Sequence, residues 1–153
     1  MTRQAPLPLT RRNLPLLLLQ ARESVFAHFR PILNAHGVTE QQWRIIRALL
    51  ESGPLEPREI VGHCRISSPS LAGVLARMDD LGLVHRERLP HDQRRVMVSA
   101  TARSRTLARQ MAPQIEATYQ RIEDQLGAEV IEGVYRTLDD LIARLGEQPL
   151  GDE

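Results

Sequence analysis

The stretch GLVHRERLPHDQRRVMVSAT, residues 82–101, reads as two short strands joined by a strongly charged tip. Val84 and Leu89 mark the first arm, and Val96 and Val98 mark the second. Pro90 to Arg95 are expected to join the arms as an exposed loop. Residues 84–105 contain six Arg against two acidic residues, an excess of +4. That excess is larger than an exposed sheet edge needs for protection against aggregation, so we expect the tip to meet an anion.

A well-marked helix precedes the hairpin in the segment SSPSLAGVLARMDDLG, residues 67–82. Ser68 is the predicted N-cap, Pro69 the first helical residue and Gly82 the residue after the last turn. Its first turns offer free backbone N–H groups and small side chains, which allow close approach to DNA in the major groove. The residues expected to face DNA are Ser67, Ser68, Pro69, Ser70, Ala72, Gly73 and Arg77. Without the basic hairpin behind it, the same segment would be equally consistent with an ordinary capped surface helix.

The hairpin tip is predicted to contact a phosphate backbone or the minor groove. Its expected DNA contacts are Arg86, His91, Gln93, Arg94 and Arg95. Asp92 and Arg94 are spaced to pair across the turn, which would fix the tip before it meets DNA. The alternative is a solvated hairpin, which is a common feature of protein surfaces.

Helical patterns flank this segment on both sides. Apolar positions follow helical spacing from residue 14 to about 35, and Pro31 is expected to kink or restart that helix. A second helix opens at Thr39, which has capping-box spacing to Gln42, and ends at Gly53.

Three further helices are predicted. The segment EPREIVGHCR, residues 56–65, is a short helix. Two longer helices over about 101–125 and 128–145 follow the hairpin, with Gly127 between them.

This order of elements predicts a mainly α protein with a small β-hairpin. A short helix, a tight turn, a capped helix and a hairpin form a winged helix-turn-helix lobe, here over about 39–101. Terminal helices over about 13–36 and 101–146 carry more apolar surface than one small lobe needs, and are expected to form a dimer interface. Residues 1–12 are predicted to be a flexible arm, and residues 147–153 a tail.

Composition sets the broad class of the protein. The chain has 153 residues, 42% of them hydrophobic, which fits one soluble domain with a core. Cys64 has no partner for an internal disulfide, and this suits a reducing cytoplasm. The apolar run LPLLLL, residues 14–19, is too short to span a membrane. We therefore expect a cytoplasmic protein without membrane contact.

Metal binding and catalysis find little support in the sequence. His63 and Cys64 are adjacent, and His85 and His91 flank the hairpin, but none has the paired spacing of a structural zinc site. No Ser-His-Asp set or phosphate-binding glycine loop is present. We expect no enzyme activity, no metal and no cofactor.

Cations cluster around the chain's one Trp. The residues concerned are Arg22, Ser24, His28, Trp43 and Arg44. A lone Trp is more often part of a core than a ligand platform, whereas neighbouring cations favour an anion pocket. The residues themselves leave the two interpretations open.

The chain resembles the MarR family of bacterial winged-helix regulators. The family's wing pattern is Asp-x-Arg, a strand and Leu-Thr before a helix, and DQRRVMVSATARS matches it at Asp92, Arg94 and Thr101. Ala100 and Ser104 depart from the usual Leu and Gly. The segments LLQARE, FRPIL, TEQQWRI, SPSLAGVLARM and DQRRVMVS are similar to the subgroup that represses homoprotocatechuate (4-hydroxyphenylacetate) degradation.

The resemblance implies a repressor of an aromatic-acid catabolic operon. It implies a homodimer formed by the first and last helices, a pseudo-palindromic double-stranded operator, and an effector bound between these helices and the DNA-binding lobe. The effector would be a hydroxylated aromatic or heteroaromatic carboxylate, like a hydroxyphenylacetate or a hydroxynicotinate. Trp43 would form its wall, Arg22 or Arg44 would bind its carboxylate, and Ser24 or His28 would meet its hydroxyl. The alternative function is a dimeric helical interaction module that does not bind DNA.

Overall fold

A computed structural model describes residues 2–146 of the chain. Within this range the chain forms seven helices and one two-stranded antiparallel hairpin, in agreement with the predicted class. The elements are α1 (Leu14–Phe26), α2 (Arg30–Ala35), α3 (Glu40–Ser52), α4 (Pro57–Cys64), α5 (Ser68–Asp80), β1 (Val84–Leu89), β2 (Asp92–Ala100), α6 (Ala102–Leu126) and α7 (Ala128–Leu145). The predicted tail, residues 147–153, lies outside the described residues.

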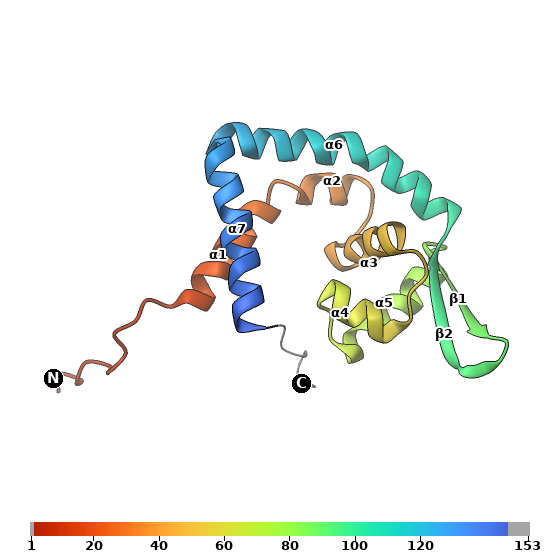
Figure 1. The fold of residues 1–153 in the computed structure, drawn as a ribbon, viewed down its shortest axis with the longest axis horizontal. Helices are drawn as coiled ribbons and strands as arrows, with labels where there is room; N and C mark the ends of the chain where they lie inside the picture. Colours follow the sequence, from red (N-terminus) through yellow and green to blue (C-terminus); the bar gives the residue numbers. More distant parts are fainter. Residues whose placement is uncertain (1, 147–153) are drawn as a thin grey trace.

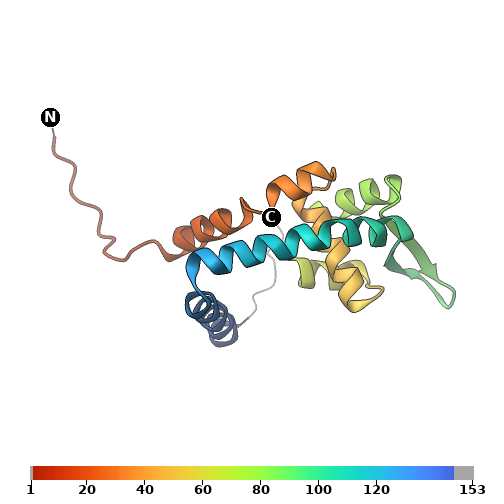
Figure 2. The same cartoon turned by 90° about the horizontal axis from the view of Figure 1, so that it is seen from above.

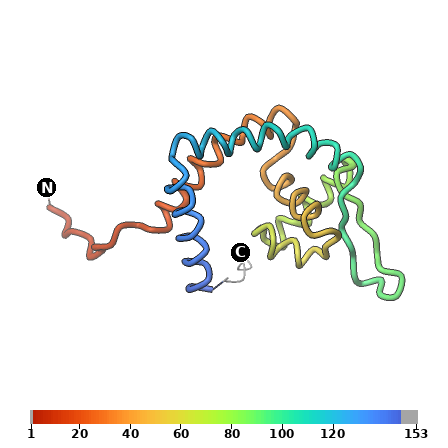
Figure 3. The backbone as a smooth tube through the Cα atoms, turned by 45° about the horizontal axis from the view of Figure 1, so that its top comes forward, coloured from red at the N-terminus to blue at the C-terminus, as the bar shows by residue number. Residues whose placement is uncertain are grey.

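The long helix α6 connects two parts of the molecule (Figure 1). One end of α6 joins the lobe of α3, α4, α5 and the hairpin, and the other end joins α7. Seen from above, α6 runs along the length of the molecule, and the N-terminal arm points away from the lobe (Figure 2). The tube drawing in Figure 3 shows α1 and α7 on one side and α3 to α5 on the other.

An aliphatic core holds the lobe together. The fully buried large side chains include Ile45, Ile46, Ile60, Met78, Val84, Val98 and Met111. They come from α3, α4, α5, both strands and α6, so burying them joins the hairpin and the long helix to one core. Each such side chain contributes about 1.5–3 kcal/mol through its removal from water.

The N-terminal helix is interrupted, as the position of Pro31 predicts. Residues 27–29 form turns between α1 and α2, and Pro31 lies in the first turn of α2. Proline is tolerated there because the first helical N–H groups have no partner within the helix. Beyond this break α2 packs on α6 and contributes the buried Ile32 and Leu33 to the core.

Two capping boxes start the helices that frame the lobe. At α3, Gln42 N–H donates to Thr39 Oγ1 (3.1 Å) and Thr39 N–H donates to Gln42 Oε1 (3.1 Å), as predicted. At α6, Thr101 N–H donates to Ser104 Oγ (3.0 Å) and Ser104 N–H donates to Thr101 Oγ1 (3.2 Å). The departure from Gly at position 104 therefore adds a cap, and the Ser104 side chain is fully buried at the strand-to-helix junction.

The terminal helices expose apolar side chains instead of burying them. Neither α1 nor α7 contains a buried residue. Their exposed large apolar residues are Leu14, Leu16, Leu18, Leu19 and Val25 on α1, and Val130, Val134, Tyr135, Leu138, Ile142 and Leu145 on α7. None of the helices within residues 2–146 is long and apolar enough to span a membrane.

Candidate functional site

Helix α5 begins one residue earlier than the sequence predicts. Ser67, not Ser68, is the N-cap, and its carbonyl accepts a hydrogen bond from Leu71 N–H (2.9 Å). Ser67 Oγ donates to Ser70 Oγ (3.0 Å) instead of capping a backbone N–H. The residue before the N-cap, Ile66, is buried in the core.

The two faces of α5 differ sharply in size and burial. Leu71, Leu75 and Met78 are buried against the lobe. The outward residues are Ser68, Pro69, Ser70, Ala72, Gly73 and Arg77, all exposed. A methyl group added at Gly73 would have no described atom within 4 Å. Apart from Arg77, the outer face of α5 therefore carries small, exposed side chains.

The loop of the hairpin is shorter than predicted. Leu89 pairs with Asp92, which leaves two residues, Pro90 and His91, at the tip. Arg88 pairs with Val96, so Gln93, Arg94 and Arg95 form a bulge in β2 and not part of an open loop. Bulges of this kind re-aim the side chains of the strand that carries the extra residues.

Polar contacts inside the hairpin hold the bulge in shape. Arg88 Nη1 donates to the Gln93 carbonyl (2.5 Å), and Gln93 Nε2 donates to the Leu89 carbonyl (3.2 Å). Asp92 Oδ1 accepts from both the backbone N–H (3.1 Å) and Nε (3.3 Å) of Arg94, which is the pairing that the sequence predicts. The Arg94 side chain remains 92% exposed.

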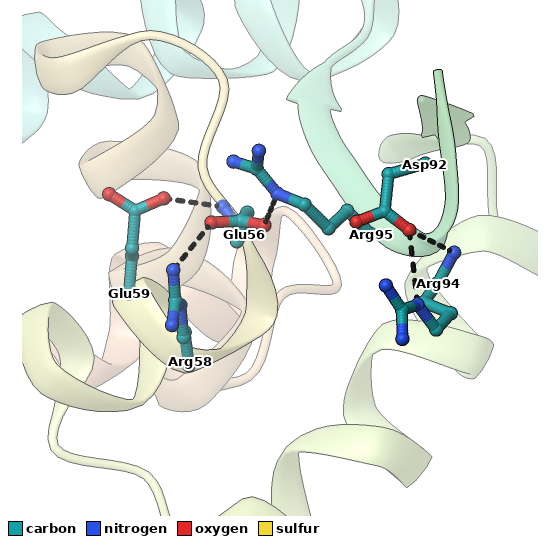
Figure 4. A network of polar contacts seen from close by, with 6 residues as sticks. All are labelled: Glu56, Arg58, Glu59, Asp92, Arg94 and Arg95. Carbon is teal, nitrogen blue, oxygen red and sulfur yellow. Dashed lines mark hydrogen bonds and ion pairs between the residues drawn. The ribbon is translucent and has the colours of Figure 1, made fainter. Parts of the chain in front are cut away.

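Two other predicted DNA contacts make ion pairs with the lobe. Arg86 Nε donates to Asp79 Oδ2 (2.9 Å) on α5, and Arg95 Nε donates to Glu56 Oε1 (2.7 Å) before α4. The Arg95 guanidinium, followed by Arg58, lowers the pKa of the Glu56 carboxyl from its ordinary value of 4.5. Arg86 is thus paired with α5. Arg95 is paired with Glu56, whereas Arg94 points away from Glu56 and pairs with Asp92 (Figure 4).

A second candidate site is an open groove of about 1120 Å³. It lies between the terminal helices and the lobe, with contributions from α1, α3, α4, α6 and α7. Its apolar lining includes Leu17, Leu18, Val25, Phe26, Phe29, Trp43, Ile115, Tyr119, Val134 and Leu138. Its charged lining includes Arg22, Glu40, Arg44, Arg47 and Glu51. The groove can enclose an aromatic ring and offers charges of both signs.

The structure brings three of the five predicted ligand residues to this groove. Trp43, Arg22 and Arg44 line it. Ser24 and His28 do not: Ser24 Oγ donates back to the Gln20 carbonyl (2.9 Å), and His28 is exposed in the turn after α1. Ser24 lies within α1 but on a different face from Arg22 and Phe26, which line the groove, and His28 lies in the turn that follows α1.

Both predicted cations are held by protein acceptors. Arg22 forms an ion pair with Glu40 on α3. Arg44 Nη1 donates to the Cys64 carbonyl (2.6 Å), which ties α3 to the end of α4. Arg44 therefore has a structural partner, and Arg22 shares its charge with a carboxylate.

Arg47 and Tyr119 are functional candidates that the sequence reasoning missed. Arg47 is exposed in the groove, and its Nε donates to Glu51 Oε1 (2.7 Å). Hydrogen bonding of the guanidinium to Glu51, and then to Tyr119, raises the pKa of Arg47. The Tyr119 ring packs on Phe29, with ring centroids 4.8 Å apart at 56°. The positively charged Arg47 thus lies in the same groove as the aromatic rings of Phe29 and Tyr119 and the Tyr119 hydroxyl.

One signal for Arg47 was present in the sequence. Glu40, Trp43 and Arg47 are spaced by three and four residues, so a helix places them on one face. Tyr119 lies more than seventy residues away on α6, and only the tertiary fold brings it to this face.

Cys64 lies at the floor of the groove as a buried thiol. Its Sγ is 3.5 Å from the Arg44 carbonyl oxygen, and burial raises the pKa of the thiol. Within residues 2–146, no three His, Cys, Asp or Glu side chains are grouped closely enough to hold a metal ion.

Comparison with known proteins places this geometry in a family. The profile described as the MarR family matches residues 36–95, which contain the lobe and most of the hairpin. The chain is 40% identical over 131 residues to the homoprotocatechuate degradative operon repressor of Escherichia coli, covering 86% of this chain and 88% of that protein. The chain belongs to the MarR family.

Two solved structures extend this MarR-family assignment to the whole fold. The transcriptional regulator PA4135 is 43% identical, with a TM-score of 0.81 over 86% of this chain and 96% of that one. NadR in complex with 4-hydroxyphenylacetate is 38% identical, with a TM-score of 0.74 over 92% and 97% of the two chains. The Escherichia coli relative is named as a repressor and PA4135 as a transcriptional regulator, which confirms the prediction of a MarR-type winged-helix regulator and not an enzyme.

Proposed function

We propose that this MarR-family protein is a homodimeric repressor that binds operator DNA through α5 and the hairpin. A small hydroxylated aromatic carboxylate would release it, and 4-hydroxyphenylacetate is the first candidate. Two relatives support this choice: a repressor of a homoprotocatechuate degradative operon, and NadR with 4-hydroxyphenylacetate bound. Both similarities cover most of this chain.

The open outer face of α5 beside the hairpin carries the DNA-binding part of the proposal. α5 and the hairpin tip lie on the side of the lobe away from α6 (Figure 1). The small residues of α5 leave room for base edges, and the free N–H groups of its first turn favour a phosphate. Arg94, 92% exposed at the tip, can reach a phosphate or the minor groove at the same time.

Dimerisation follows from the surface of α1 and α7. Exposed apolar side chains on both helices need a partner in water, and a second copy supplies the same surface by two-fold symmetry. The two α5 helices would then lie about 34 Å apart, one turn of DNA, to enter successive major grooves.

The effector is placed in the groove between the terminal helices and the lobe. Trp43 and Phe29 supply apolar walls for a ring, Arg47 has terminal N–H groups for a carboxylate, and Glu40 offers an acceptor for a hydroxyl. We assign the carboxylate to Arg47 rather than to Arg44, because the Arg47 side chain is 52% exposed although its Nε donates to Glu51, whereas Arg44 is partly buried and its Nη1 donates to the Cys64 carbonyl.

This location explains how a ligand would control DNA binding. A molecule in the groove touches both the dimerisation helices and the lobe that carries α5. It would stabilise the dimer geometry in which the α5 helices no longer match the operator spacing. Its effect on repression is limited by the ratio of its affinities for the two geometries.

Replacing Gly73 with Ala tests whether the outer face of α5 meets DNA. No described atom lies within 4 Å of the added methyl group, and Ala favours a helix over Gly by about 1 kcal/mol, so the free protein should not lose stability. If α5 lies deep in the major groove, the methyl group should clash and lower operator affinity by about tenfold.

Gly62→Ala on α4 is the matched control, because it also adds a methyl group to an exposed helical glycine with no described atom within 4 Å. We expect it to raise the melting temperature equally and to leave operator affinity unchanged. Equal affinities for Gly73→Ala and the wild type, measured by fluorescence anisotropy on upstream DNA, would argue against α5 as the recognition helix.

A further inference from the structure

A buried carboxylate lies where the hairpin meets the lobe. The Glu56 side chain is 11% exposed, and its two oxygens face Arg95 Nε (2.7 Å) and Arg58 Nη2 (3.3 Å). Its backbone N–H donates to Glu59 Oε1 (3.0 Å) at the first turn of α4 (Figure 4). The acid is therefore held by its own helix and by the hairpin together.

The backbone beside Glu56 makes a second attachment. Leu55 N–H donates to the Val98 carbonyl (3.0 Å), and Val98 N–H donates to the Leu55 carbonyl (2.8 Å). Both side chains are buried in the core. This bridge fixes β2 at the base of the hairpin, and the Glu56–Arg95 pair lies nearer to the tip. Because β2 is attached to the lobe at two points along its length, the angle between the hairpin and the lobe is fixed. A single attachment would let the hairpin rotate about that point.

The bulge links this attachment to the exposed tip. Arg95 and Arg94 are neighbours within the bulge of β2, and they point in different directions. Arg95 reaches toward α4, and Arg94 remains 92% exposed with Asp92 as its partner. Because the two share one irregular stretch of backbone, the position of Arg95 constrains that of Arg94.

We propose that Glu56 is a positioning residue for DNA binding, which holds Arg95 and so presents Arg94 at a fixed place relative to α5. This inference rests on the proposed operator binding. Arg95 is then a structural residue of the hairpin and not a DNA contact. The acid acts at a distance from the nucleic acid, since its oxygens face two guanidinium groups of its own chain.

An electrostatic role and a positioning role of Glu56 predict opposite effects of Glu56→Gln on the affinity for DNA. The change removes a negative charge, so a purely electrostatic role predicts tighter binding to DNA. A positioning role predicts weaker binding by about tenfold and a salt slope that is smaller by about one unit, the loss expected for one displaced phosphate contact. Affinity is measured by fluorescence anisotropy on the operator across a range of salt concentrations.

A double-mutant cycle with Arg94→Ala identifies the route of the effect. If Glu56 acts through Arg94, then Glu56→Gln should change affinity by less than about twofold once Arg94 is gone. Arg95→Gln should repeat this pattern, and it serves as the second variant because the Arg95 side chain is 47% exposed and its loss spares the core. Additive effects of Arg95→Gln and Arg94→Ala would instead mark Arg95 as a direct contact and overturn the proposal.

Arg58→Gln is the control, because Arg58 is the other partner of Glu56 but is 83% exposed and lies outside the hairpin. It should leave operator affinity within about twofold of the wild type. If Arg94→Ala itself has no effect on affinity, the assigned DNA contact of the hairpin fails. If Arg94→Ala weakens binding and Glu56→Gln does not, only the positioning role fails.

Discussion

Replacing Tyr135 and Ile142 together with Glu should produce a folded monomer whose operator affinity is lower by about 100-fold or more. The two residues lie two turns apart on one face of α7 and are 55% and 49% exposed. They do not line the effector groove, so the change acts on dimerisation alone. Affinity falls because a dimer gains about 10²–10⁴-fold from binding both half-sites at once.

Arg136→Glu is the matched control for this variant. It changes the net charge by −2, as the double substitution does, but on the polar face of α7, about 100° around the helix from Tyr135. Light scattering should show a dimer for the control and a monomer for the double variant, with unchanged helix content by circular dichroism. A double variant that remains dimeric, or a monomer that binds the operator as tightly as the wild type, would refute the assigned interface.

Arg47→Gln should abolish release by 4-hydroxyphenylacetate while leaving operator binding intact. Arg47 is a groove cation whose side chain is half exposed and whose contacts to Glu51 and Tyr119 favour its charged form. A charge-assisted hydrogen bond contributes about 1.5–3 kcal/mol, so effector affinity should fall by about 10- to 100-fold. Isothermal titration calorimetry measures this loss directly.

Two comparisons separate a ligand contact from a general loss of charge. Arg30→Gln removes the same charge outside the groove and should bind the effector normally. The neutral amide of 4-hydroxyphenylacetate should bind the wild type about as weakly as the acid binds Arg47→Gln. Unchanged effector affinity in Arg47→Gln would move the carboxylate to another cation, and Arg22 would then be the next residue to test.

The local signals of the sequence predicted most of the fold. Thr39 with Gln42, Gly53 and Pro31 mark where helices begin, end and break, and each acts through groups within a few residues. The winged-helix order followed from these boundaries and from the charged hairpin. The start of α5 was predicted one residue late, because the true N-cap, Ser67, donates its hydroxyl to Ser70 Oγ and caps no backbone N–H.

The sites were harder to predict because distant residues decide which charges are available. Arg94 and Arg95 are equivalent in the sequence, but of these two it is Arg95 that pairs with Glu56, thirty-nine residues away. Arg44 and Arg47 lie one turn apart, but the Cys64 carbonyl holds Arg44. The sequence pattern shows where cations cluster, but tertiary contacts decide which of these Arg side chains are available to bind DNA or a ligand.

Ligand-released operator binding is tested most directly by titrating the wild-type protein bound to labelled upstream DNA. Fluorescence anisotropy would follow the complex as 4-hydroxyphenylacetate, and separately a hydroxynicotinate, is added at constant ionic strength. We expect the complex to weaken steeply with salt and to dissociate when one of these acids is added, with operator affinity lowered at least about tenfold. A protein that binds no duplex at low salt, or a complex that neither acid changes, would contradict this expectation.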